Sequence, residues 1–199
     1  MYERNNVIRQ FERTIAAYCN APFGVAVESC TAAILMCCVY LKVGQVRIPK
    51  RTYHSVPLSI IRAGGNVVFD DRKWRGAYQL KPYPIIDSAV RFKKNMYKPG
   101  FFQCLSFQYS KHLPIGRGGM ILTDNKKAAE WFRRMRNDGR REIPKEKDMA
   151  AQSGWNFYIT PEQAARGLSL FYWRIYGKND LPDIKMDYMD LSGLRLFKK

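Results

Sequence analysis

The sequence has no apolar segment long enough to cross a membrane. Its apolar stretches, such as residues 32–41 and 120–122, are far shorter than the roughly 20 residues that a transmembrane helix needs. The residues that follow Met1 carry charged and amide side chains, so no apolar signal-peptide core stands there. These absences exclude integral membrane proteins and predict a cytoplasmic location.

Histidine is scarce, and the spacings of a metal site are missing. The chain has two histidines, His54 and His112, and no C-x-x-C or H-x-x-x-H pattern. Five cysteines are an odd number, and in a protein without a secretory signal they are expected to be reduced thiols. The sequence therefore predicts buried, unreactive cysteines and no metal site.

Acidic residues are few beside basic ones, which leaves a net charge of +17. This surplus attracts phosphate groups, whether on nucleic acid, on nucleotide-linked substrates or on anionic membranes. No zinc finger, RNP-type strand or G-x-x-G loop accompanies it, which disfavours nucleic-acid binding. The arginines of residues 133–141 are expected to line a solvated helix face, and contact with nucleic acid, an acidic partner or a phosphorylated substrate remains an open alternative.

The composition, with 46% hydrophobic and 26% charged residues, is typical of a globular protein with a real core. Hydrophobic periodicity predicts helices that alternate with short strands. The expected helices span residues 7–18, 32–41, about 55–63, 126–136 and 161–172, and the expected strands 23–27, 45–48, 66–69, 85–87, 104–107 and 119–123. Residues 72–84 show neither period and are interpreted as a loop.

This order predicts a three-layer α/β fold with a mostly parallel sheet flanked by helices and a site beyond the carboxyl edge of the sheet. Polar residues follow several of the expected strands. They form the motifs Ser29-Cys30-Thr31-Ala32, Thr52-Tyr53-His54, Asp87, and Ser106 with Lys111.

In this order the motifs resemble those of the DegT/StrS-type sugar aminotransferases, fold-type I enzymes that use pyridoxal phosphate. Residues 29–33 are similar to the family's S-G-T-A-A turn, 85–89 to its V-I-E-D-A-A segment, and 105–111 to its F-S-F-x-x-x-K. The resemblance covers nearly all of residues 8–170. It implies a shortened large domain over residues 1–176, without the family's small domain, and leaves the tail of residues 177–199 unassigned.

The resemblance implies that Lys111 forms an internal aldimine with pyridoxal phosphate and that Asp87 pairs with the pyridine nitrogen. The phosphate would lie at a helix start, where free N–H groups and the helix dipole favour an anion. The residues implied for the phosphate and the ring are Ser29, Cys30, Thr31, Ala32, Tyr53 and Ser106. Asn156 matches an asparagine that reaches the cofactor of a neighbouring subunit, which implies a homodimer.

Three functions remain open at this point, and one of them is a basic protein that associates with nucleic acid and reuses this scaffold. The other two depend on the family site. The first is a pyridoxal-phosphate-dependent aminotransferase that acts on a keto-sugar nucleotide, with glutamate as the implied amino donor. The second is a non-catalytic descendant that binds a sugar nucleotide or a protein partner. Departures from the family motifs support the second, because Cys30 replaces the turn glycine, Val90 a polar residue and Tyr158 an arginine. Without the small domain, an open and wet site is expected.

Overall fold

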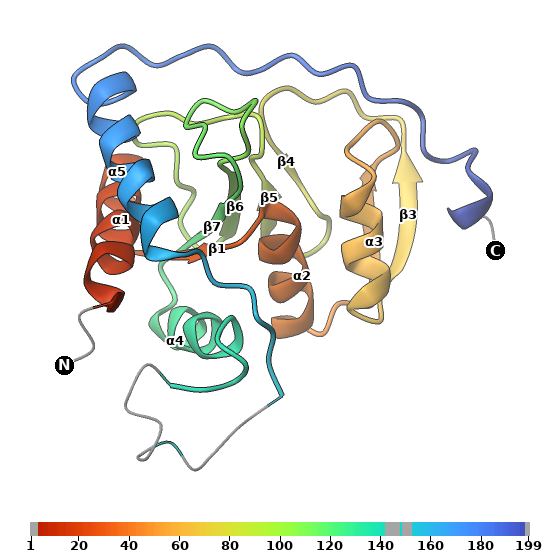
Figure 1. The fold of residues 1–199 in the computed structure, drawn as a ribbon. Helices are drawn as coiled ribbons and strands as arrows, with labels where there is room; N and C mark the ends of the chain where they lie inside the picture. The colour runs from red at the N-terminus through yellow and green to blue at the C-terminus, as the bar shows by residue number, and fades with distance from the viewer. Residues whose placement is uncertain (1–3, 142–147, 149–152, 198–199) are drawn as a thin grey trace.

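The computed structural model describes residues 4–141, 148 and 153–197 (Figure 1). The helices are α1 (Arg4–Cys19), α2 (Cys30–Tyr40), α3 (Ser55–Arg62), α4 (Lys126–Met135) and α5 (Pro161–Arg174), with a 3-10 turn, η2 (Arg195–Phe197). The strands are β1 (Phe23–Val27), β2 (Gln45–Pro49), β3 (Asn66–Asp70), β4 (Tyr78–Gln79), β5 (Ile85–Asp87), β6 (Phe102–Ser106) and β7 (Gly119–Thr123). None of the helices described is both long and apolar enough for a membrane span.

Five strands form one sheet in the order β1-β7-β6-β5-β4, and β2 pairs with β3 beside it. Only β5 with β6 and β2 with β3 run parallel, and the other three pairings are antiparallel. The expectation of a mostly parallel sheet is therefore wrong for the larger sheet. The described segment between β6 and β7 contains no helix, so the chain turns back after β6 instead of crossing over.

Helices cover both faces of the sheet, which confirms the three-layer α/β fold. Because side chains of a strand alternate between faces, Val25 and Val27 of β1 join the core under α2 and α4, whereas Ala26 joins the core under α1 and α5. Strand β7 divides in the same way, with Ile121 on the first side and Leu122 on the second. Figure 1 shows α1 beside α5 at one side of the sheet.

Local sequence signals set several element boundaries as expected. Ser29 is the N-cap of α2, and its hydroxyl accepts a hydrogen bond from the amide of Ala32 at 3.1 Å. Thr160 and Gln163 form a capping box at the start of α5, with Pro161 in the first turn. Gly64 follows α3 with a φ of 85°, a left-handed conformation that favours glycine.

The interpretation of residues 72–84 as a loop is wrong at its centre. Strand β4 lies there and pairs with β5, so that Tyr78 stands opposite Asp87. Beyond it, Arg47 of β2 and Lys81 exchange two backbone hydrogen bonds, of 2.7 and 3.0 Å, which join the two sheets. A strand of two residues is too short to show alternation, so its sequence gives no periodic signal.

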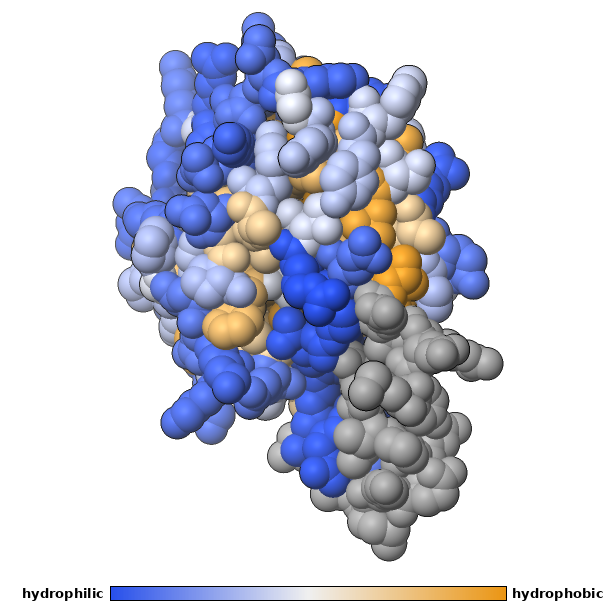
Figure 2. Space-filling model, turned by 90° about the vertical axis from the view of Figure 1, so that its left-hand side faces the viewer, coloured by the Kyte–Doolittle hydropathy of each residue, from blue (hydrophilic) through white to orange (hydrophobic). Residues whose placement is uncertain are grey.

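The arginines at the end of α4 do not all face solvent, contrary to the expected solvated stripe. Arg136 is 3% exposed and forms an ion pair at 2.5 Å with Glu12 of α1, which is 1% exposed. Arg133 lies 3.5 Å from the same carboxylate. The surface on the α1 and α5 side is largely hydrophilic, with small apolar patches (Figure 2).

Replacement of Arg136 by alanine should destabilise the protein by about 3–5 kcal/mol, because it leaves the Glu12 carboxylate buried without its main partner. Denaturant unfolding measures this loss. Lys127→Ala, which removes an exposed lysine of α4, is the matched control and should change stability by no more than about 0.5 kcal/mol. Equal effects of the two variants would contradict the structural role of Arg136.

Candidate functional site

The start of α2 lies against the first residue of β7. Gly119 packs so closely that a Cβ there would come within 2.6 Å of the amide nitrogen of Cys30, so a larger residue would displace this turn. Among the hydrogen bonds of the described residues, none uses the amide N–H of Cys30 or Thr31. The amide of Ala32 already donates to Ser29. Two backbone donors and the positive end of the helix dipole are thus available to an anion.

Asp87 lies at the end of β5 and is 5% exposed. Its Oδ1 accepts a hydrogen bond from the amide of Ala89 at 2.9 Å, and its Oδ2 accepts one from the Tyr78 hydroxyl, also at 2.9 Å. The Cys30 Sγ lies 4.0 Å from Oδ1. Burial raises the pKa of Asp87, and these hydrogen bonds and Lys111 oppose the rise.

Lys111 is half-buried in the turn after β6, and its charge interacts with Asp87 and Cys30. Desolvation lowers its pKa, although the two acidic neighbours partly counteract this effect. A lower pKa increases the neutral fraction of the amine, which is the nucleophilic form. The structure therefore brings together a buried carboxylate, a half-buried amine with a lowered pKa, and a helix start.

The other predicted site residues differ in their hydrogen-bond partners and in their exposure to solvent. The Thr31 hydroxyl lies 2.8 Å from that of Ser55 in α3, and the Ser106 hydroxyl accepts a 3.5 Å hydrogen bond from the amide of Gln108. Tyr53 is 49% exposed. Asn156 is exposed and forms a β-bridge with Asn137, and the hydrogen bonds and ion pairs of the described residues do not link its side chain to the other predicted site residues.

The tail, residues 177–197, crosses the site in an extended path that leads from α5 toward β3 (Figure 1). Its first half is fixed by hydrogen bonds from His112 to the carbonyl of Pro182, at 2.9 Å, and from Ile184 to the carbonyl of Val90, at 3.0 Å. Arg91 binds the Asp183 carboxylate through two nitrogens, at 2.7 and 2.9 Å. Further along, Leu191 is fully buried.

Tyr188 of the tail packs against two aromatic residues near the candidate site. Its ring centroid lies 5.8 Å from that of Trp74, nearly parallel, and 6.5 Å from that of Tyr53. Burial raises the pKa of Tyr188, and the charges of Asp87 and Cys30 add to the rise. The tail thus lies against the aromatic residues that border a site for which an open and wet environment was expected.

Sequence reasoning missed three residues here, Trp74, Tyr78 and Tyr188. Trp74 and Tyr78 belong to the segment interpreted as a loop, and Tyr188 belongs to the unassigned tail. Two aromatic residues four positions apart, ahead of a strand that ends in an aspartate, are the signal that the sequence offers for Trp74 and Tyr78.

The donor set fits pyridoxal phosphate. The two free amides at the start of α2 suit a phosphate, and the Lys111 amine suits an aldehyde. Oδ1 of Asp87 accepts hydrogen bonds from the Ala89 amide and, at 4.0 Å, from the Cys30 thiol, whereas Oδ2 accepts one from Tyr78 and keeps a second lone pair for a protonated ring nitrogen. The nearby Cys30 thiol is the feature that fits least well, since it occupies space beside this carboxylate.

Comparison with known structures supports the fold. The chain is similar to DesV of S. venezuelae, solved with a ketimine intermediate, at 20% identity and a TM-score of 0.69 over 83% of this chain and 56% of that one. It is similar to Helicobacter pylori PseC, an aminotransferase involved in the biosynthesis of pseudoaminic acid, at 15% identity and a TM-score of 0.69 over 82% of this chain and 56% of that one. It is also similar to DesI, solved with its TDP-sugar product, at 18% identity and a TM-score of 0.66 over 83% of this chain and 52% of that one.

The chain therefore spans little more than half the length of these structures. No curated protein sequence matches it. The family model described as the DegT/DnrJ/EryC1/StrS aminotransferase family matches residues 2–91 and 92–171. With most of its length matched, the chain belongs to the DegT/DnrJ/EryC1/StrS aminotransferase family.

Proposed function

We propose that the chain is a pyridoxal-phosphate-dependent aminotransferase that acts on the keto group of a sugar nucleotide, with Lys111 as the residue that holds the cofactor. The observation that carries this proposal is the half-buried Lys111 amine, with its lowered pKa, beside the buried Asp87 carboxylate. Family membership and the likeness to DesI, which was solved with a TDP-sugar product, support the substrate class. We expect glutamate as the amino donor and a cytoplasmic location.

The bound cofactor would supply an electron sink for the transfer of an amino group. The amides of Cys30 and Thr31 would bind its phosphate, and Asp87 would hold a proton on its ring nitrogen. The Lys111 Nζ would accept and return the proton at the reacting carbon, because its lowered pKa brings its two protonation states closer in energy near neutral pH. The tail would exclude water.

A second function has specific support. The Tyr78 hydroxyl and the Cys30 thiol both approach the carboxylate that the cofactor ring would need. A non-catalytic descendant that binds a sugar nucleotide or a protein partner would keep such contacts without loss. Covalent capture of the cofactor distinguishes the two functions.

Incubation with pyridoxal phosphate, followed by borohydride reduction and peptide mapping, should place a stable adduct on Lys111. The desolvated amine has a larger neutral fraction than an exposed lysine, so it should react first. Lys111→Ala should lose the adduct, and Lys126→Ala, which removes an exposed lysine of α4, should keep it. Adducts only on surface lysines would favour the non-catalytic function.

Asp87→Asn should weaken pyridoxal phosphate binding about tenfold or more, a loss of at least about 1.4 kcal/mol, without lowering thermal stability at pH 7. Burial raises the pKa of Asp87 in the folded protein above that in the unfolded chain, so ionised Asp87 opposes folding at neutral pH. This penalty is present above the folded pKa and disappears as pH falls below the unfolded value of about 3.9.

The measurements are a fluorescence titration with the cofactor and thermal unfolding as a function of pH. The stability of the variant relative to the native protein should be greatest at neutral pH and should decline toward acid. The amide of asparagine can donate to the Tyr78 hydroxyl in place of the native hydrogen bond, so packing is kept. Unchanged cofactor affinity in the variant would remove Asp87 from the proposed site.

We expect a homodimer in which Asn156 of one subunit serves the cofactor of the other, because Asn156 matches the family residue that reaches a neighbouring subunit and its side chain is exposed. Light scattering should give twice the 23.2 kDa chain mass. Mixed dimers of Lys111→Ala and Asn156→Ala chains provide the sharper test. Each mixed dimer has one site with both native residues, so mixing should restore cofactor binding to the Asn156→Ala chain. No restoration, or a monomer, would contradict the prediction.

A further inference from the structure

A cavity of about 730 Å³ lies beside the candidate site. Its walls come from residues 50–51 after β2, residues 71–76 after β3, Val90, and residues 183–188 of the tail. It connects to the candidate site through aromatic contacts, because the ring centroids of Trp74 and Tyr78 are 4.6 Å apart and the Tyr78 hydroxyl bonds to Asp87. We infer that this cavity binds a small molecule that carries a phosphate or diphosphate group.

The charge of the lining supports this inference. Six lining residues are basic and three are acidic. Asp183 is held by Arg91, and Asp71 lies 2.6 Å from the ammonium of Lys50, so two of the three acidic groups are neutralised. Outside the lining, Asp70 lies 3.3 Å from Arg72 and Asp190 lies 3.0 Å from Lys50, so the excess of positive charge rests on Arg51, Lys73, Arg75 and Lys185, with Asp187 as their acidic neighbour in the lining.

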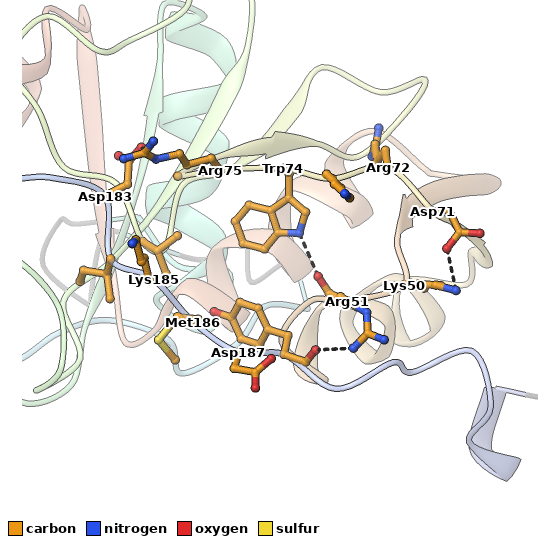
Figure 3. Close-up of a pocket in the computed structure, with 15 residues that line it drawn as sticks. Lys50, Arg51, Asp71, Arg72, Trp74, Arg75, Asp183, Lys185, Met186 and Asp187 are labelled. Carbon is orange, nitrogen blue, oxygen red and sulfur yellow. Dashed lines mark hydrogen bonds and ion pairs between the residues drawn. The ribbon is translucent and has the colours of Figure 1, made fainter.

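Cationic side chains line the cavity on both sides of Trp74. Figure 3 shows Arg75 and Lys185 on the Asp183 side of Trp74, and Lys50 and Arg51 on the other side. Arg75 is 78% exposed with its Nε 4.0 Å from Asp183, and the ion pairs of the described residues include neither Lys73 nor Lys185. Like charges gathered around one cavity repel each other, and a bound polyvalent anion relieves that repulsion.

The apolar part of the lining indicates what the anionic group is attached to. The Trp74 indole N–H donates to the carbonyl of Arg51 at 2.9 Å, so the ring offers the cavity an apolar edge and no hydrogen-bond donor. Ile184, Met186 and Val90 extend the apolar surface. The volume falls in the range of about 300–1,000 Å³ that is typical of small-molecule sites. A charged head with an apolar or ring-shaped body fits this lining, whereas a nucleic-acid backbone needs an open groove.

Most of the lining comes from residues 71–76, in or next to the segment that was interpreted as a loop, and from the tail, which sequence analysis left unassigned. It does not require the chemistry proposed for Lys111, since none of the lining residues is Lys111, Asp87 or part of the α2 start. Binding there should also hold the tail in place, because the tail forms one wall of the cavity and contributes Lys185.

Calorimetric titration of the full chain with inorganic pyrophosphate at low salt tests the site. The double variant Lys73→Gln with Arg75→Gln should bind pyrophosphate at least tenfold more weakly than the native protein. The control pair Lys126→Gln with Lys127→Gln removes the same charge from exposed positions of α4, away from the cavity, and should bind like the native protein. No binding, or equal losses in both double variants, would overturn the proposal.

Two further readouts separate the possible outcomes. Pyrophosphate should slow tryptic cleavage after Lys185 at least several-fold in the native protein and not in the cavity variant. Random-sequence RNA that binds more tightly than pyrophosphate and loses affinity equally in both double variants would assign the charge to nucleic acid instead. Cofactor attachment at Lys111 should be unchanged in the cavity variant. If no form of the protein attached the cofactor at Lys111 while the native protein still bound pyrophosphate, the proposed function would be refuted. The assignment of the cavity would then still stand.

Discussion

At the outer edge of β1, backbone N–H and C=O groups face no neighbouring strand of the described residues. Side chains of α1 and of the end of α4 bond to these groups instead, which holds the two helical layers to the sheet. The Glu12 carboxylate accepts a hydrogen bond from the amide of Ala26 at 3.0 Å, and Arg136 donates to the carbonyl of the same residue. Arg133 donates to the carbonyl of Gly24 at 3.1 Å. An exposed strand edge invites pairing with another chain. Here one buried ion pair closes it and joins α1, β1 and the end of α4.

The same edge determines where the candidate site begins. The amide of Glu28, directly after β1, donates to the carbonyl of Phe157 at 2.7 Å, so the strand stays held up to the residue before Ser29. On its other side, β1 pairs with β7 in a register that places Val27 opposite Gly119. The helix start that would receive a phosphate is therefore fixed from two directions. An anion site made from backbone amides depends on this rigidity, because the amides have no side chain to adjust.

The sequence predicted the parts of this arrangement that rest on local chemistry. Capping residues such as Ser29 and Thr160 act within one turn of their own helix, and the apolar alternation of β1 and β7 needs only the two faces of a sheet. Asp87 and Lys111 were found through family motifs. The inward direction of Arg136 could not be predicted, since its partner Glu12 lies 124 residues earlier in the chain. The position of Tyr78 and the path of the tail could not be predicted for a similar reason, because both depend on contacts with residues that are distant in the sequence.

The surroundings of Asp87 bear on the choice between the catalytic and the non-catalytic function. A carboxylate at the end of β5 that is buried against Tyr78 and Cys30 is costly to keep ionised, and a protein selected only for its fold would gain by replacing it. The chain instead retains the aspartate together with a half-buried lysine whose charge partly offsets that cost. Desolvation shifts the pKa of each group and each partly offsets the shift of the other, a combination that is frequent at functional sites. The tail adds to this environment, because it stacks the Tyr188 ring on Trp74, which in turn lies against Tyr78, the hydrogen-bond donor to Asp87.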